Sequence, residues 1–275
     1  MSLIGSLRNN YKQIITLIAF LCVGMPLLLP MQLPIKIEDT TMNFYNEIED
    51  LKPGDVVVIG TGMLSSTYLE LYPQYVVLTE HVLRKEGVKI IIVSHTVDAV
   101  IFINKALVEL KVFERKTYGK DFVNLGFIAG EEAAIAGLSK NLHALITVDY
   151  YKNMLSSLPM LENINDARDY TMVIDVTSTS DVQYWLNQAG GPYGTKIGVA
   201  ASAVKATEAT SYYSAGQIFG LLVSLQGAAQ YEILINKPGY AVKSLSAQSA
   251  VLLFYIALLV YGNITYFRSR RAKKI

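Results

Sequence analysis

Residues 88–113 read VKIIIVSHTVDAVIFINKALVELKVF, and this stretch decides the fold class. Its beginning, 88–94, is a nearly continuous apolar run rich in isoleucine and valine, as expected for a strand buried on both faces. The following residues, 97–113, have the composition of a helix that ends near basic residues. A buried strand followed directly by a helix is typical of a mostly parallel α/β sheet.

The same alternation continues on both sides of this stretch. Further buried strands are expected at 56–60, 122–127, 144–149, 171–177 and 195–204, and further helices at 67–86, 131–142 and 182–189. Pro73 is expected to begin or interrupt the helix at 67–86. This order predicts an α/β fold with a mostly parallel, Rossmann-like, doubly wound sheet of about six strands.

Two uncharged apolar runs lie near the ends of the chain, at 14–33 and 245–267. About 20 apolar residues in a helix cross a hydrocarbon core of about 30 Å, so both runs are expected to be transmembrane helices. The first run has the basic start of a signal peptide. However, it is longer than a typical signal core and no small-x-small cleavage site follows it, which favours an uncleaved anchor.

Charge is divided between the ends and the middle of the chain. The terminal segments contain seven of the 24 basic residues and none of the 23 acidic ones, which leaves the middle with 17 basic residues and a net charge of −6. Short basic flanks stay in the cytoplasm, whereas a long domain is translocated regardless of its own charge. We therefore predict a two-pass protein of the cell membrane with both termini cytoplasmic. An inward-facing domain is the alternative.

These observations divide the chain into six segments. A short amphipathic helix is expected at 39–51, with Phe44, Ile48 and Leu51 on one face, in a stalk that separates the first membrane helix from the domain. The segments are a cytoplasmic tip (1–13), the first transmembrane helix (14–33), the stalk (34–52), an extracytoplasmic α/β domain (53–243), the second transmembrane helix (245–267) and a basic cytoplasmic tail (268–275).

Cysteine and histidine usage speaks against a metal centre or a cofactor. The single cysteine, Cys22, lies in the first apolar run, so the domain contains neither a disulfide nor a thiolate ligand. His81 and His143 are isolated and lack the spacing of a metal-binding motif. No nucleotide-binding fingerprint is present, since 60–65 reads GTGMLS. We expect no metal and no cofactor.

Several motifs resemble those of a family of prokaryotic membrane-anchored α/β proteins that has no established function. They are LKPGDVVVIG (51–60), STYLELYP (66–73), YGKDFVNLGF (118–127), LPM (158–160) and YYSAGQIFGLLVSLQGAAQYE (212–232). The last motif departs from the family pattern at four positions, Ala215, Ser224, Gln226 and Gln230. The resemblance covers roughly residues 50–235. It implies an α/β fold and membrane anchoring, and it implies no activity.

Ligands of open α/β sheets bind beyond the carboxyl ends of the strands. The residues that this rule selects as candidate ligand-binding residues are Gly60, Thr61, Gly62, Ser65, Ser94, Gly130, Asp149 and Thr177. The Gly-Thr-Gly sequence followed by two serines can bind an anion through its backbone N–H groups. A tight turn is the alternative reading of the same residues.

His95 is the best single catalytic candidate, because a histidine at a strand end can act as a general base near neutral pH. It requires an orienting carboxylate, and Asp98, Asp149 and Asp175 are the candidates, with Asp175 at the end of the fifth expected strand. The alternative is a local capping role for Ser94 and His95 at the start of the next helix.

Residues 214–235 contain small side chains every four residues, at Gly216, Gly220, Ser224 and Ala228. On one helix these positions form a flat stripe that allows another backbone to approach closely. A helix packed on the sheet, a subunit interface and a third membrane span are the three readings of this segment. Tyr68, Tyr72 and Tyr75 share a helix face and suit either an interface or the roof of the sheet.

Three functions remain after this reading. The first is a non-enzymatic, membrane-tethered protein that binds a ligand, or assembles with itself or with a membrane-protein partner. The second is a hydrolase-type envelope enzyme that uses His95 and Asp175. The third is a sensor, which would need a separate partner because the predicted cytoplasmic ends are short. Nucleic acid is disfavoured because the middle of the chain is acidic.

Overall fold

The computed structural model describes residues 11–28 and 34–272. The chain divides into two compact units. Residues Lys36–Lys237 form the first, which we call the α/β unit, and the two terminal segments form the second, which we call the terminal unit.

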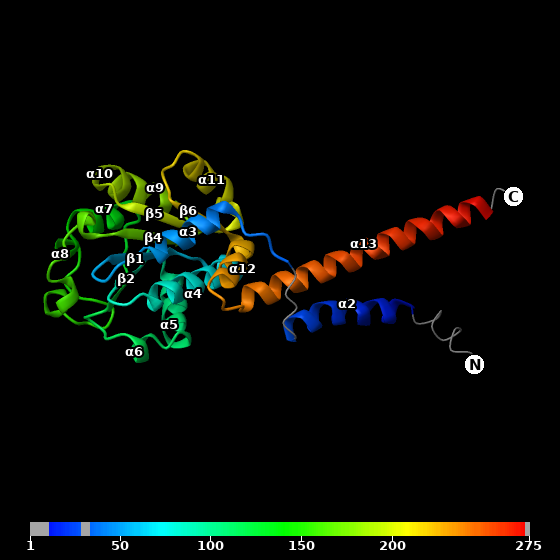
Figure 1. Cartoon of the computed structure of the whole chain (residues 1–275), viewed down its shortest axis with the longest axis horizontal. Helices are drawn as coiled ribbons and strands as arrows, with labels where there is room; N and C mark the ends of the chain where they lie inside the picture. The colour runs from blue at the N-terminus through cyan, green and yellow to red at the C-terminus, as the bar shows by residue number, and fades with distance from the viewer. Residues whose placement is uncertain (1–10, 29–33, 273–275) are drawn as a thin grey trace. The chain divides into compact units, whose positions relative to one another are not determined.

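The α/β unit is built on a six-stranded, all-parallel sheet (Figure 1). The strand order is β3-β2-β1-β4-β5-β6, so the chain moves outward from β1 in one direction and then, from β4, in the other. The strands are β1 (Val56–Gly62), β2 (Lys89–Ser94), β3 (Phe122–Phe127), β4 (Met172–Thr177), β5 (Lys196–Ala201) and β6 (Gly220–Val223). The expected parallel α/β sheet is therefore confirmed.

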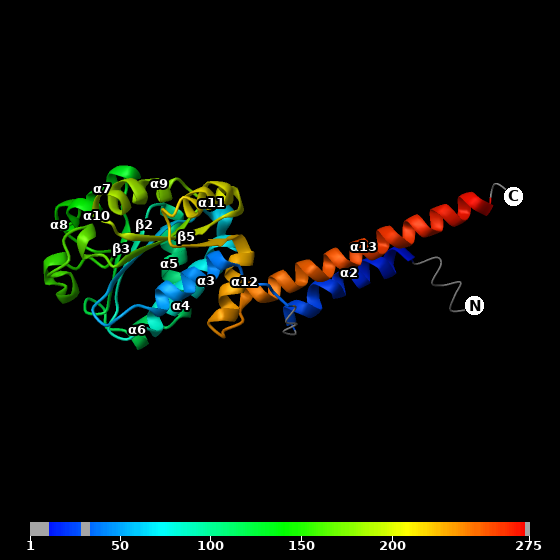
Figure 2. The same cartoon turned by 45° about the horizontal axis from the view of Figure 1, so that its top comes forward.

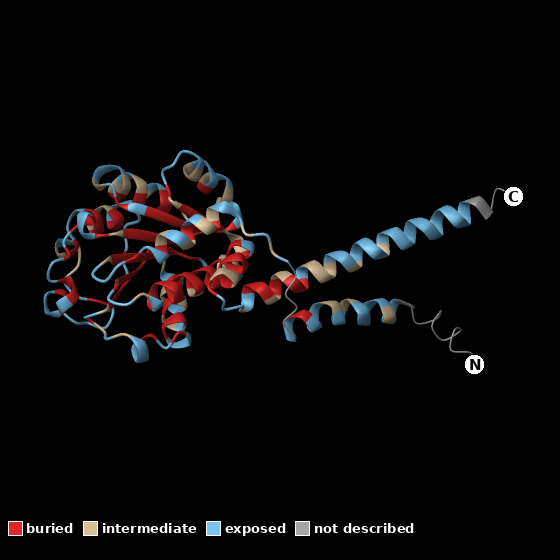
Figure 3. Ribbon diagram, viewed as in Figure 1, coloured by how far each residue is buried: buried red, intermediate tan, exposed pale blue. Residues whose placement is uncertain are grey.

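Helices cover both faces of this sheet (Figure 2). On one face lie α3 (Asp39–Glu49), α4 (Tyr68–Arg84), α5 (Val97–Glu109), α6 (Val112–Arg115) and α12 (Ser224–Leu234). On the other lie α7 (Glu132–Lys140), α8 (Leu142–Leu145), α9 (Asp181–Trp185), α10 (Gly191–Tyr193) and α11 (Ala206–Ser214). Figure 3 shows the strands buried between these layers.

Each strand contributes to both layers because its side chains alternate. In β1, Val57 and Ile59 pack into the layer of α4, whereas Val56 and Val58 pack into the layer of α7. Because both faces of the sheet are covered, this period of two explains why the strands are mostly apolar in the sequence.

One predicted strand was wrong. Residues 144–149 do not form a strand of the sheet: α8 ends at Leu145, and Val148 makes only an isolated bridge with Met154. The side chain of Asn141 accepts a hydrogen bond from the backbone N–H of Ala144, which caps a helical turn where the apolar pattern predicted extended chain.

Residues 214–235 are not one helix, so the predicted stripe of small residues was also wrong. After α11 the chain turns at Gly216 (φ +70°), forms the edge strand β6 from Gly220, and enters α12 through Ser224 (φ +52°). Two of the four small residues belong to α12: Ser224 is its first residue and has a positive φ, and Ala228 is fully buried. The four positions therefore share no helix face.

Residues 39–49 form the expected amphipathic helix, but it is not part of a stalk. Phe44 and Ile48 of α3 are completely buried in the core of the α/β unit, and Phe44 packs edge-on against Phe219 and Tyr231. The apolar face that the sequence shows is thus the face that joins the domain.

The tyrosines of α4 are not an exposed aromatic face. Tyr72 and Tyr75 are buried in the core, and Tyr68 stacks on Tyr72 at a centroid distance of 4.9 Å. α4 runs from Tyr68 to Arg84 through Pro73, so this proline neither begins nor ends the helix. A role of these three tyrosines in binding another protein loses its basis, because two of them are buried.

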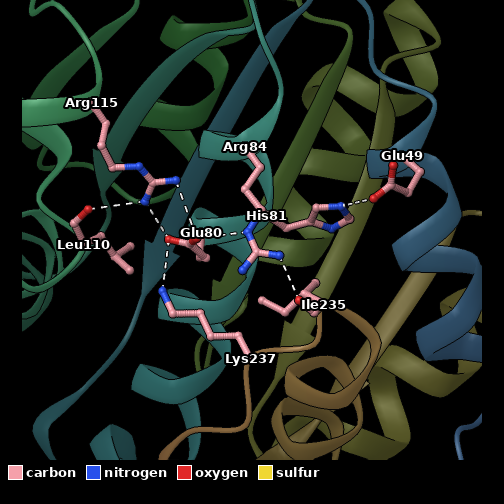
Figure 4. A network of polar contacts seen from close by, with 8 residues as sticks. All are labelled: Glu49, Glu80, His81, Arg84, Leu110, Arg115, Ile235 and Lys237. Carbon is pink, nitrogen blue, oxygen red and sulfur yellow. Dashed lines mark hydrogen bonds and ion pairs between the residues drawn. The ribbon is translucent and has the colours of Figure 1, made fainter.

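A buried acid with several cations stabilises the far end of α4 (Figure 4). Glu80, 5% exposed, accepts hydrogen bonds from Arg84 at 3.0 Å and Arg115 at 2.6 Å, and forms an ion pair with Lys237 at 3.3 Å. Next to it, His81 lies 2.7 Å from Glu49 of α3. These contacts join α3, α4, α6 and the chain segment after α12.

Among the residues that the structure describes, the terminal unit contains one helix that is long and apolar enough to cross a membrane. This helix, α13 (Tyr240–Ala272), carries exposed apolar side chains along much of its length (Figure 3). The N-terminal helix α2 (Tyr11–Leu28) is apolar but shorter. The predicted first span, 14–33, extends into residues 29–33, which lie outside the described residues, as do 1–10 and 273–275.

Candidate functional site

Three titratable side chains from separate parts of the chain meet at one edge of the sheet. His95 directly follows β2, Asp175 lies in β4, and Asp181 is the first residue of α9. One ligand atom from each lies within 4.8 Å of the others, and all three side chains are buried. We call these residues, together with Trp185 of α9, the polar cluster.

The strand order explains why these residues meet. β1 lies between β2 and β4, and Gly60 of β1 is paired in register with Asp175 of β4. The backbone N–H of His95 donates to the carbonyl of Thr61 in β1 at 2.9 Å, which holds the histidine beside the end of β1. The cluster therefore lies at the carboxyl ends of the central strands, where the strand order reverses and where open α/β sheets bind ligands.

Two glycines of β1 make room for the cluster. A Cβ atom at Gly60 would lie 3.1 Å from Nε2 of His95, 3.3 Å from Nε1 of Trp185 and 3.5 Å from Oδ1 of Asp175. A Cβ atom at Gly62 would lie 2.1 Å from Oδ2 of Asp181. These polar atoms thus converge on space that any other residue type in β1 would fill.

Most polar atoms of the cluster are buried without hydrogen-bond partners among the described residues. Both ring nitrogens of His95, both carboxylate oxygens of Asp175 and Nε1 of Trp185 are in this condition. His95 is 7% exposed, and Asp175 and Trp185 are completely buried. Each buried polar group left unpaired costs about 1–3 kcal/mol, so the cluster lowers the stability of the fold.

Burial also displaces the protonation equilibria of the cluster. Burial raises the pKa of Asp175 well above its usual range, and the nearby carboxylate of Asp181 raises it further. Burial lowers the pKa of His95, and the charge of Asp181 opposes this effect. Both groups are therefore driven toward their neutral forms, because the described structure supplies no full counter-charge to them.

Some predicted site residues join this cluster. Gly60 and Gly62 line it, and the hydroxyl of Thr177 donates to Asp181 at 3.2 Å. His95 and Asp175, the predicted catalytic pair, converge: Nε2 of His95 and Oδ1 of Asp175 face the same space over Gly60.

Other predicted residues lie elsewhere. Thr61 alternates to the opposite face of β1 and donates to the carbonyl of Val176. Ser65 donates to Asp98 at the surface, and Ser94 donates to the backbone of Thr96. Asp149 is held by Tyr118 at 2.6 Å and Asn153, and Gly130 lies in the loop before α7, outside the cluster.

Asp181 and Trp185 were missed in the sequence. They are four residues apart, one helical turn, and they follow the serine- and threonine-rich end of β4, which was the available signal. Neither Asp98 nor Asp149 belongs to the cluster, so Asp175 and Asp181 are the carboxylates near His95.

Compared with protein-family models and with curated proteins, the chain matches none of them. Membership of the membrane-anchored family that the motifs resemble therefore stays a prediction.

Proposed function

We propose that the protein is a membrane-tethered binding protein whose α/β unit holds a small polar ligand in the polar cluster. The observation that supports this most strongly is the set of unpaired, buried polar atoms of His95, Asp175 and Trp185. A ligand that satisfies these atoms would remove the cost of burying them.

A purely structural role explains the cluster less well than ligand binding does. Buried acids that stabilise a fold are surrounded by cations and hydrogen-bond donors, as Glu80 is in this chain. Asp175 is more deeply buried than Glu80 and has no such partner among the described residues. Strongly perturbed titratable groups at the switch point of an α/β sheet are typical of functional sites.

Removing Asp175 is therefore expected to leave the fold as stable as before, or to stabilise it by about 1–3 kcal/mol. The variant Asp175→Val places a β-branched apolar side chain in β4, and Asp175→Asn keeps the shape without the acid. Unfolding of the dialysed full-length protein in detergent is followed by the fluorescence of Trp185, the single tryptophan of the chain.

A loss of more than about 1 kcal/mol in both variants would show that Asp175 is needed for folding, and would contradict the proposal. Glu80→Gln, which removes a fully paired acid, is the matched control and is expected to destabilise the protein.

We also propose that α13 and α2 both anchor the protein, with the termini in the cytoplasm and the α/β unit outside. The apolar length of α13 and the basic residues of the terminal segments support this arrangement. In a Cys22→Ser background, a cysteine at Val204, which is 85% exposed, should react with a membrane-impermeant maleimide on intact cells. Labelling only after lysis would place the unit in the cytoplasm.

An envelope enzyme is the second candidate function. The observation in its favour is that His95 has the neighbouring carboxylate, Asp175, that acid–base chemistry requires.

Assembly with copies of the chain or with a membrane-protein partner stays a prediction. The stripe of small residues and the tyrosine face that motivated it are absent from the surface. The mass of the detergent-solubilised complex tests this prediction.

A further inference from the structure

The donor set of the polar cluster suits a cation. His95 offers an imidazole nitrogen, and Asp175 and Asp181 each offer a carboxylate oxygen, all within 4.8 Å of one another. Two carboxylates within this group would repel an anion. A positive charge between them would instead satisfy both acids and the histidine together.

The mixture of donors also limits which cation fits. Ca²⁺ and Mg²⁺ prefer sites made of oxygen atoms, whereas a nitrogen and two carboxylate oxygens suit borderline ions such as Zn²⁺. Cu⁺ prefers sulfur ligands, and the single cysteine, Cys22, lies in α2 of the terminal unit.

The distances are close to those of a bound ion. Bonds of about 2.0–2.2 Å in a tetrahedral site separate the ligand atoms by roughly 3.4 Å. The three atoms here lie within 4.8 Å, so side-chain shifts of roughly 1 Å bring them into range. Three protein ligands also leave a coordination position for water or an external molecule.

Trp185 lies where its indole N–H can orient a carboxylate ligand of such an ion. Its Nε1–H is an unpaired donor that points into the same space over Gly60 as Oδ1 of Asp175. A metal-bound carboxylate normally has its second oxygen held by a nearby donor, which fixes its orientation. The indole N–H is therefore suited to position Asp175 without binding the ion itself.

From these observations we propose that the polar cluster binds one divalent transition-metal ion of the Zn²⁺ class, with His95, Asp175 and Asp181 as ligands and Trp185 as a positioning residue. This inference rests on the proposed function, because it names the ligand of the same site.

The test uses the full-length protein without an affinity tag, purified in detergent, stripped with a chelator and dialysed. Zn²⁺ and Co²⁺ are titrated in competition with a chromophoric chelator. We expect one ion per chain, and an affinity about 100-fold or more lower in each of His95→Ala, Asp175→Asn and Asp181→Asn. Trp185→Phe should weaken binding about 10-fold, the effect expected of a residue that orients a ligand.

Two controls separate the cluster from other side chains of the same types. His143→Gln replaces a histidine on α8, and Asp98→Asn replaces a carboxylate that hydrogen-bonds to Ser65 at the surface. Both should bind Zn²⁺ as the unchanged chain does. Circular dichroism of every variant checks that it is folded.

Failure of this inference and failure of the proposed function give different results. If no ion binds, or if the three ligand variants bind as well as the unchanged chain, the metal assignment is overturned. If this happens while Asp175→Val keeps its full stability, the cluster remains a site for another ligand. If Asp175→Val and Asp175→Asn both unfold more easily, the proposed function is overturned as well.

Discussion

Gly220→Ala is expected to lower the free energy of unfolding of the α/β unit by about 3 kcal/mol or more. A Cβ atom at this position would lie 2.6 Å from Cβ, 2.7 Å from Cα and 2.8 Å from the backbone nitrogen of Phe44. These atoms belong to the backbone of α3 or are fixed to it, so no side-chain rotation relieves the clash. Either β6 or α3 must move, and both are packed into the core.

The effect is measured by thermal or denaturant unfolding followed by Trp185 fluorescence. Gly216→Ala is the matched control from the same segment: its φ is +70° but no atom lies within 4 Å of the added Cβ, so a loss of about 1 kcal/mol is expected. If Gly220→Ala were as stable as the unchanged protein but lost an oligomeric mass, the interface helix predicted from the sequence would be correct and β6 would be wrong.

Glu80→Gln is expected to destabilise the α/β unit by about 2–3 kcal/mol. The substitution removes the negative charge that Arg84, Arg115 and Lys237 share. The acid is buried, but the three cations are 32–51% exposed and regain water, which keeps the loss below that of a fully buried pair. Glu114→Gln, at an exposed ion pair with Lys111, should change stability by less than about 0.5 kcal/mol.

The pH dependence of this difference gives a second readout. Burial by itself raises the pKa of Glu80, but the hydrogen bonds from Arg115 and Arg84 outweigh burial and hold the pKa below its usual value of 4.5. The folded state therefore favours the ionised acid, and its stabilising effect is full above 4.5 and lost as the pH falls through the lowered pKa. The gap between the unchanged protein and Glu80→Gln should shrink in acid; a gap that is constant down to pH 2 would contradict the assigned role.

The sequence pattern predicted the five longer strands of the sheet because each is a mostly apolar run. β6 is different: it has only four residues, and Gly220 and Ser224 at its ends fall into a period that also suits a helix. Four small residues arose here from separate causes, such as the turn at Gly216 and the close approach to Phe44 at Gly220. A local pattern does not distinguish these causes from one helix face.

The sequence predicted only part of the polar cluster. His95 and Asp175 stand at the ends of recognisable strands, so the carboxyl-end rule selects them directly. Asp181 and Trp185 lie at the two ends of the short helix α9 that follows β4. Their approach to His95 depends on the register between β1 and β4, which pairs residues more than 110 positions apart. The predicted strand at 144–149 also placed Asp149 at a strand end that the fold does not contain.

The central claim is that the polar cluster binds one divalent metal ion of the Zn²⁺ class. Anomalous diffraction from crystals of the full-length protein grown with Zn²⁺ tests it most directly. We predict one strong anomalous peak between Nε2 or Nδ1 of His95 and the carboxylates of Asp175 and Asp181, over Gly60. Zinc bound only elsewhere, with no density among these side chains, would contradict the claim.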